Sequence, residues 1–338
     1  MLNTIIIIIY PLFIYLINVF LTKKNLLPNY SGDNHQKFFN KKEIQLSGGL
    51  FLIPVFFIIT YDHSTVLVIS IFFIFLLGLS SDIGFFSSAK FRLLTQSIII
   101  LFFLFYSKTT LTSVRIDAFD LMLENYWFSL FFTLTCLMIL TNGTNFIDGL
   151  NGLVLTYYLV IIFIIFNLEL FEYSFLNQSD IFLMLMIFIY LILFNIFNQL
   201  YLGDSGSYII GFLLGYFLLQ IFENNLLFSP YFVVLLFWYP AFEILFSIIR
   251  KIKSKKSPLK PDNKHLHHLL FLYIFKKYKF KNNLSNNLSA FIIIMYNAII
   301  FLIAIQNIYH TGLQVLLFVF NIVIYLALYS KLTQLKKL

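Results

Sequence analysis

The sequence has very little charge. Asp, Glu, Lys and Arg together make up only 11% of its 338 residues, whereas a soluble domain carries about 25%. This excludes an ordinary soluble globular protein. Hydrophobic residues account for 60% of the chain and its mean hydropathy is +0.88. These values predict an all-α integral membrane protein with several spans.

Cysteine is also scarce. The single residue, Cys136, lies in an apolar run, so the chain cannot form a disulfide framework within itself, and redox chemistry is not expected. The apolar start at residues 4–22 lacks a charged leader region and a small-residue cleavage site, so it is interpreted as a first span rather than a removable signal peptide. No aromatic-basic module accompanies the charges, so nucleic-acid binding is not expected.

The apolar stretches are numerous. A helix needs about 20 apolar residues to cross a bilayer, and fewer where a functional loop dips into it. By this measure the sequence contains eleven predicted spans, at 4–22, 48–61, 65–80, 93–107, 126–141, 152–167, 181–197, 207–222, 230–249, 288–306 and 312–330. An odd number of spans places the two termini on opposite faces. The chain has no solenoid repeat or inverted repeat, which counts against a secondary transporter.

The basic residues indicate how these spans are oriented. Of the 23 Lys and Arg residues, 21 lie in segments 23–47, 81–92 and 250–287 and in the C-terminal tail, and only Lys108 and Arg115 lie on the other face. The positive-inside rule therefore predicts an external N-terminus and a cytoplasmic C-terminus. We expect one domain, 1–338, with cytoplasmic loops at 23–47, 81–92, 142–151, 198–206 and 250–287. The net charge of +8 also favours attraction to anionic lipid headgroups.

Three clusters of carboxylates or amides next to glycine fall on the predicted cytoplasmic face, around residues 80–92, 142–151 and 202–207. The motif Gly203-Asp204-Ser205-Gly206-Ser207 places a carboxylate where the backbone can approach a ligand, which suits a hard cation such as Mg²⁺, although Asp and Ser are also favoured helix caps. Residues 142–153 hold several amides and one carboxylate between apolar helices, where polar groups are costly unless they are needed. If the helix continues through this segment, Asn145, Asp148 and Asn151 share one face. The alternative is an amide-rich helix cap.

A fourth cluster, residues 260–268, is basic and ends in three histidines, His265, His267 and His268. Histidines that close together do not make an ordinary tetrahedral zinc site, and no cysteine is near. Acidic groups opposite a basic, histidine-bearing loop instead predict a metal–phosphate active site.

These motifs together resemble those of the polyprenyl-phosphate N-acetylhexosamine-1-phosphate transferases, which begin cell-envelope glycans such as O-antigen, capsule or teichoic acid and are related to the phospho-N-acetylmuramoyl-pentapeptide translocase. The resemblance covers residues 33–270, and the predicted eleven-span topology is also similar to the family's. Supporting matches are Ser47-Gly48-Gly49, Lys90-Phe91-Arg92-Leu93-Leu94-Thr95-Gln96 and Pro240-Ala241-Phe242-Glu243.

The resemblance implies transfer of N-acetylhexosamine 1-phosphate from a UDP-sugar to undecaprenyl phosphate, with release of UMP, at the bacterial inner membrane. It implies Mg²⁺, or Mn²⁺, as cofactor. By analogy with the family, the site residues are Asp204 and Asn145 for the metal, Asn151 and Tyr201 for uracil, Lys90 for phosphate, His265, His267 and His268 for the sugar phosphate, Asp82 for positioning or proton handling, and Asp148 as a further catalytic carboxylate.

Two positions depart from the family pattern. Ser81 stands where most relatives have the first of two acids, and Asn151 stands where the family has an aspartate. A lipid phosphate is already mostly ionised at neutral pH, so in-line attack needs positioning and charge neutralisation more than a strong base. We therefore expect an active, single-displacement enzyme. The alternatives are an inactive relative that acts as a binding or assembly subunit, and an ion-coupled transporter that uses Asp148 and Asp204. The choice of UDP-sugar, the final polymer and the oligomeric state, including a homodimer, stay open.

Overall fold

A computed structural model describes residues 2–28, 44–86, 88–260 and 262–337. Within these ranges the secondary structure is helical apart from two isolated β-bridges, Pro28 with Gln45 and Leu46 with Tyr201. The α-helices are α1 (Leu2–Lys23), α2 (Gly48–Thr60), α3 (Thr65–Asp82), α4 (Ala89–Ser107), α5 (Asp117–Leu123), α6 (Tyr126–Ile147), α7 (Leu153–Asn167), α8 (Gln178–Ile196), α9 (Gly203–Asn224), α10 (Pro230–Leu236), α11 (Trp238–Lys253), α12 (Leu266–Tyr278), α13 (Asn282–Ala304) and α14 (Thr311–Lys337). Two short 3₁₀ helices, η1 (Leu170–Tyr173) and η2 (Ile305–Asn307), complete the described part.

The architecture confirms an all-α protein with membrane-spanning helices. Eight described helices are long and apolar enough to cross a bilayer, and the bent pair α10–α11 makes a ninth candidate. Two of the other predicted spans correspond to shorter apolar helices, α2 and α7. Each of the eleven predicted stretches is therefore helical, whereas the span count and the orientation stay predictions.

The helix ends differ from the predicted loops. Helix α3 continues to Asp82, α6 continues to Ile147, and α9 already begins at Gly203, so parts of the predicted loops 81–92, 142–151 and 198–206 belong to helices. Segment 250–287 contains α12 and the start of α13, and most of segment 23–47 lies outside the described residues. Hydropathy detects burial in lipid rather than helical hydrogen bonding, so polar helix ends fall outside an apolar window.

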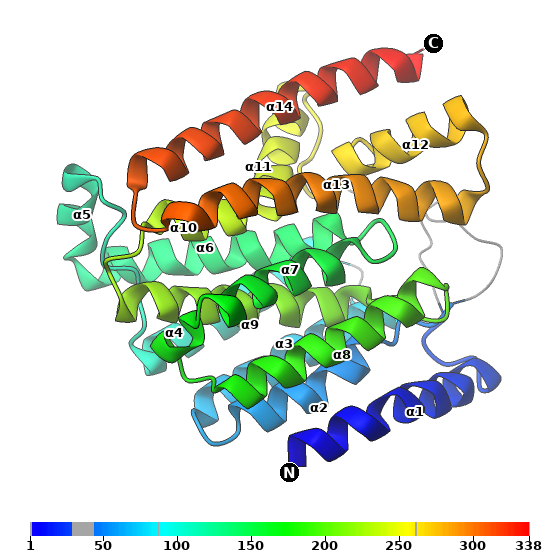
Figure 1. Cartoon of the computed structure of the whole chain (residues 1–338), viewed down its shortest axis with the longest axis horizontal. Coiled ribbons are helices and arrows are strands. Elements are labelled where there is room, and N and C mark those ends of the chain that lie inside the picture. The colour runs from blue at the N-terminus through cyan, green and yellow to red at the C-terminus, as the bar shows by residue number, and fades with distance from the viewer. Residues whose placement is uncertain (1, 29–43, 87, 261, 338) are drawn as a thin grey trace.

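Helix α9 lies at the centre of the bundle, and nearly all of its residues are buried. It packs against α2, α3 and α6, while α1 and α14 lie on opposite outer sides of the molecule (Figure 1). Because α9 is surrounded by other helices rather than by lipid, the polar residues of its first turn can meet the ends of α3 and α6.

The α10–α11 pair is sharply bent, by 75°, and α11 crosses the neighbouring helices steeply (Figure 1). Pro240 lies in the first turn of α11 and has no N–H to offer the carbonyl of Leu236, four residues earlier. The hydroxyl of Tyr157 donates a hydrogen bond to that carbonyl at 2.8 Å, so the break leaves no unsatisfied backbone acceptor there. The bend directs α11 and its basic C-terminal turn to the cavity described next.

Candidate active site

The polar helix ends meet at one end of the bundle around a cavity of about 840 Å³. Its lining comes from the C-terminal ends of α3 and α6, the N-terminal ends of α4 and α9, the turn at 148–151, helix α11 and segment 258–268. The predicted site residues that line it are Asp82, Asn145, Asp148, Asn151, Tyr201, Asp204, His265 and His268.

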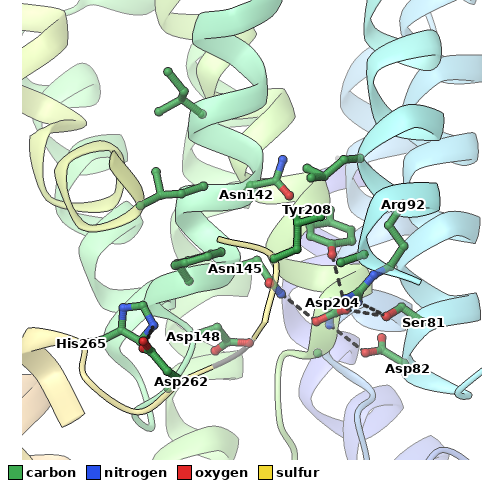
Figure 2. A pocket seen from close by; sticks show the side chains of 18 of the residues that line it. Ser81, Asp82, Arg92, Asn142, Asn145, Asp148, Asp204, Tyr208, Asp262 and His265 are labelled. Carbon is green, nitrogen blue, oxygen red and sulfur yellow. Dashed lines mark hydrogen bonds and ion pairs between the residues drawn. The ribbon is translucent and has the colours of Figure 1, made fainter. Parts of the chain in front are cut away.

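Asp204 is held by three neighbouring elements. Its Oδ2 accepts hydrogen bonds from Ser81 Oγ at 2.6 Å and Arg92 Nη1 at 2.7 Å, and its Oδ1 accepts one from Asn145 Nδ2 at 2.7 Å. Figure 2 shows Ser81 and Arg92 on one side of the carboxylate and Asn145 on the other. The predicted metal ligands Asp204 and Asn145 are thus brought together, and an arginine that the motif assignment left without a role is paired with one of them.

Asp82 lies beneath this group and is buried. Its carboxylate accepts hydrogen bonds from the backbone N–H groups of Asp204 and Ser205 at 2.7 and 3.0 Å, and from the Ser205 hydroxyl at 2.7 Å. These N–H groups belong to the first turn of α9 and have no helical acceptor, so Asp82 caps the helix from outside. Gly203 has φ +75°, and a Cβ there would lie 2.8 Å from Asp82 Oδ2. The glycine therefore permits this close approach.

Asp148 begins the turn that joins α6 to α7, where it follows the last residue of α6. Loss of hydration on burial, reinforced by the negative charges of Asp204 and Asp82, raises the pKa of Asp148 well above its ordinary value. Next in the chain is Gly149, where an added Cβ would lie 2.6 Å from Nε2 of both His267 and His268. The turn is therefore packed directly against the histidine cluster.

The histidine cluster is held by acidic partners. His265 Nδ1 lies 2.9 Å from Oε1 of the buried Glu243, and His265 Nε2 lies 3.5 Å from Asp262 Oδ1. The other oxygen of Glu243 accepts a hydrogen bond from the Tyr325 hydroxyl at 2.9 Å. Glu243 comes from the Pro240–Glu243 motif, so the structure gives this matched residue a role in orienting His265.

A basic and acidic pair closes the loop between α11 and α12. Arg250 donates to both oxygens of Asp262, at 2.8 and 3.1 Å. Although burial alone would raise it, the hydrogen bonds and positive charge of Arg250 lower the pKa of Asp262 to about 2. Lys251 Nζ donates to the carbonyls of Pro258 and Lys260 at 3.0 and 2.6 Å. Together these contacts hold the loop over the cavity, with Asp262 beside His265 (Figure 2).

His267 does not line the cavity, in contrast to its predicted contact with the sugar phosphate. It is fully buried in α12, and its Nδ1 lies 3.5 Å from the Tyr239 hydroxyl. Burial, reinforced by the neighbouring rings of His268 and His265, lowers the pKa of His267 well below its ordinary value. A neutral ring behind His265 and His268 fits packing support rather than phosphate binding.

Asparagine side chains hold the far end of the turn at 148–151, which joins α6 to α7. Asn286, in the first turns of α13, accepts a hydrogen bond from the Asn151 backbone N–H at 2.7 Å, and Asn151 Nδ2 donates to Asn198 Oδ1 at 2.8 Å. Asn195 accepts a hydrogen bond from the N–H of Gly152. Asn195 and Asn286 line the cavity beside Asn151. Sequence reasoning did not single them out, because isolated asparagines in a polar segment give no pattern.

Lys90 was predicted to hold phosphate, but Arg92 is the residue of this motif that faces the cavity. Lys90 is exposed on α4 and does not line the cavity, whereas Arg92 does. Residues two apart on a helix point about 200° away from each other, so only one of the two can face the site. Of the two cations in this motif, Arg92 is therefore the one that lines the cavity and contacts Asp204.

The site suits a divalent cation that takes only one or two ligands from the protein and others from the phosphates of a substrate. No cluster of three or more His, Cys, Asp or Glu side chains among the described residues could hold a metal. Mg²⁺ does not require such a cage, since it commonly binds one or two protein oxygens together with substrate phosphates. Asp204 and the adjacent Asn145 amide supply such a pair, so the residues present fit this ion better than zinc.

One wall of the cavity is apolar. It is formed along α4, α6 and α11 by Leu93, Leu134, Met138, Ile139, Ile244 and Ile248. Leu134 precedes Asn145 by eleven residues, which on a helix corresponds to about 16 Å. The cavity therefore extends from the charged cluster along the membrane-spanning part of α6, and it offers room for a polar group and an attached apolar chain.

Comparison with known proteins agrees with this arrangement. Residues 64–222 match the model of glycosyl transferase family 4. The undecaprenyl-phosphate alpha-N-acetylglucosaminyl 1-phosphate transferase of Thermotoga maritima is 26% identical over 197 residues, which is 58% of this chain and 58% of that protein. A probable undecaprenyl-phosphate N-acetylglucosaminyl 1-phosphate transferase of Bacillus subtilis is 25% identical over 286 residues, 82% of this chain and 75% of that protein. The matched family region contains the helix ends that supply Ser81, Asp82, Arg92, Asn145, Asp148 and Asp204.

Proposed function

We propose that the chain is a polyprenyl-phosphate N-acetylhexosamine-1-phosphate transferase, which moves N-acetylhexosamine 1-phosphate from a UDP-sugar to undecaprenyl phosphate. Its similarity to glycosyl transferase family 4 and to two undecaprenyl-phosphate N-acetylglucosaminyl 1-phosphate transferases supports this proposal. The observation that carries the proposal is the meeting of Asp204, Asn145 and Arg92 at the head of a partly apolar cavity. A charged lipid phosphate and a sugar nucleotide need this combination of surfaces.

In this proposal, the diphosphate of the donor binds at Asp204. When bound, Mg²⁺ would be held by Asp204 and Asn145 and would polarise the reacting phosphorus and stabilise the leaving UMP. Arg92 adds a permanent positive charge at the same place. Tyr201 and Asn151 line the cavity on the side of the turn at 148–151, and we assign them to the uracil.

We assign the sugar phosphate to the part of the cavity that the histidines line. His265 and His268 line the cavity, and His265 is oriented by Glu243 and Asp262. Imidazole nitrogens can donate hydrogen bonds to phosphate or sugar oxygens. His267 supports this pair from behind, as its burial and its contact with Gly149 indicate.

We assign the acceptor lipid to the part of the apolar wall that α6 forms. Its phosphate would enter between α4 and α6, and its chain would lie against Leu134, Met138 and Ile139. A lipid phosphate oxygen then attacks the β-phosphorus of the donor, the bond from that phosphorus to the bridging oxygen breaks, and UMP leaves with the electron pair. Because the attacking oxygen is already ionised, no protein nucleophile is needed, which is consistent with Ser81 in place of an acid.

The proposal is tested by reconstituting the purified protein with undecaprenyl phosphate, Mg²⁺ and a panel of UDP-N-acetylhexosamines labelled in the sugar. We expect label to enter the organic-extractable lipid with at least one donor and to be lost in EDTA. Absence of product with every donor would favour the inactive binding or assembly subunit instead. Passage of a solute or ion across vesicles without UMP release would favour a transporter.

A further inference from the structure

Asp204 is already paired with a cation. Arg92 Nη1 lies 2.7 Å from Asp204 Oδ2, the same oxygen accepts the Ser81 hydroxyl at 2.6 Å, and Asn145 donates to Oδ1. Both carboxylate oxygens thus have donors. Arg92 must leave Oδ2 before a divalent ion can bind to that atom.

We propose that Arg92 is an exchangeable counter-ion. It neutralises Asp204 while the donor site is empty, and it moves from Asp204 to the donor phosphates when these arrive with their metal. The inference rests on the proposed function, because the sugar nucleotide supplies the phosphate oxygens that receive the guanidinium. The exchange gives Arg92 a further role, which is to control the access of the metal to Asp204.

The contacts of Arg92 suit an exchange. An arginine side chain has five N–H donors, yet among the described residues Arg92 donates hydrogen bonds only from Nη1, to Asp204 and to Ser81. Its Nε is buried and has no hydrogen-bond partner among the described residues. The Arg92 and Asp204 side chains are each about one-quarter exposed. The guanidinium therefore has N–H groups that no described residue accepts, and after leaving Asp204 it can form a two-pronged contact with a phosphate.

Ser81 makes the exchange easier. Its hydroxyl contacts both members of the pair and carries no charge. An aspartate at this position would place a second anion beside Arg92, which would hold the guanidinium and repel Asp204. With serine, Arg92 is opposed by one carboxylate only, and the hydroxyl still satisfies Oδ2 when Arg92 leaves.

If Arg92 and the metal compete for Oδ2, removing Arg92 should increase the affinity for the metal, whereas most substitutions in a binding site decrease it. If Arg92 competes with the metal, replacing it should tighten metal binding while slowing catalysis. If Arg92 only organises the site, replacing it should weaken metal binding or leave it unchanged. Lys90 is a matched control, because it is a cation on the same helix that does not line the cavity.

The test is binding of Mn²⁺ to the full-length protein in detergent, measured as loss of the free-ion EPR signal without sugar nucleotide or lipid. We expect Arg92→Gln to lower the Kd for Mn²⁺ by about tenfold, Arg92→Lys to lower it by about threefold, and Lys90→Gln to leave it unchanged. Adding Asp204→Asn to Arg92→Gln should remove the gain. Arg92→Lys keeps the charge and serves if Arg92→Gln does not fold.

Unchanged or weaker Mn²⁺ binding in the Arg92 variants would overturn the proposal, and so would equal tightening in Lys90→Gln. The measurement contains neither substrate, so its outcome is independent of the labelled-sugar assay. Tighter binding in a protein that transfers no sugar phosphate would support the exchange while refuting the proposed function.

Discussion

Asp204 connects four helices, because its carboxylate at the start of α9 accepts hydrogen bonds from α3, α4 and α6. Asp204→Asn should lower the turnover number by at least about a hundredfold, or about 2.7 kcal/mol. An amide is not an anionic metal ligand and does not pair with Arg92. The initial rate of UMP release should be measured across a range of Mg²⁺ concentrations, with the melting temperature as a control for folding. Wild-type turnover in a folded variant would remove the metal assignment.

Ser81 and Asp82 are neighbours with different roles. Asp82 is buried and accepts three hydrogen bonds from the start of α9, whereas Ser81 donates one neutral hydrogen bond to Asp204. Asp82→Asn should lower the turnover number more than about tenfold and should also lower the melting temperature. Unpaired buried donors cost about 1–3 kcal/mol each.

Ser81→Ala is the matched comparison, and it should be tolerated far better because Arg92 and Asn145 still hold Asp204. Both variants should be assayed for turnover and for thermal unfolding in the same detergent. Equal damage from the two substitutions would contradict the assignment of Asp82 as the cap of α9. An inactive wild type that becomes active as Ser81→Asp would show that the native chain lacks a required acid.

Helix α13 contributes to the site through one side chain near its start. Asn286 accepts the Asn151 N–H and lines the cavity, so Asn286→Ala should loosen the turn assigned to the nucleotide. We expect the KM for the UDP-sugar to rise about fivefold, or about 1 kcal/mol, with a smaller change in kcat. Asn287→Ala is the control, because Asn287 does not line the cavity and its Nδ2 donates a long hydrogen bond, 3.4 Å, to the Ile196 carbonyl. A similar rise in both variants would indicate a general effect on α13.

Helix α12 should make stability depend on pH through His267. Its pKa is lowered in the folded protein, while in the unfolded chain it titrates near 6.5. Protons therefore bind preferentially to the unfolded state below about pH 6.5, and stability falls as the pH falls toward the folded-state pKa. The melting temperature should decrease from pH 7.5 to 5.5, and less steeply in His267→Gln. Parallel slopes in the two proteins would refute this source of the pH dependence.

The sequence predicts the long apolar helices well, and the polar elements less well. All eleven apolar stretches are helical, but α5 and α12 were not anticipated, since a short helix with polar residues gives no hydropathy signal. The 75° bend between α10 and α11 lies within one continuous apolar stretch. Pro240 marks the region but does not specify the angle.

Site residues were predictable where a motif fixes the geometry. Asp204 and Asn145 meet as expected, because both belong to recognisable polar interruptions. The choice of Arg92 over Lys90 was not predictable, since both are cations in one motif and only the rotation of α4 decides which faces the cavity. Likewise, nothing in the sequence indicates that Asn286 reaches Asn151 across more than 130 positions.

In the whole molecule, α12, which belongs to the basic segment 250–287, and α5 lie at opposite ends of the bundle (Figure 1). With 21 of 23 basic residues assigned to one face, Ser257→Cys should be cytoplasmic and Ala118→Cys external. In a Cys136→Ala background, an impermeant thiol reagent should label only Ala118→Cys in intact cells. Both positions are exposed. Labelling of Ser257→Cys in intact cells would reverse the orientation.

The proposed function requires this cavity to transfer a sugar phosphate rather than a sugar. The most direct test uses a UDP-N-acetylhexosamine labelled with ³²P in the β-phosphate and with ³H in the sugar, incubated with undecaprenyl phosphate, Mg²⁺ and the purified protein. We predict that both labels enter the lipid in equal amounts and that one UMP is released for each product. Transfer of ³H alone with release of labelled UDP, or retention of both labels in the nucleotide, would refute the proposed function.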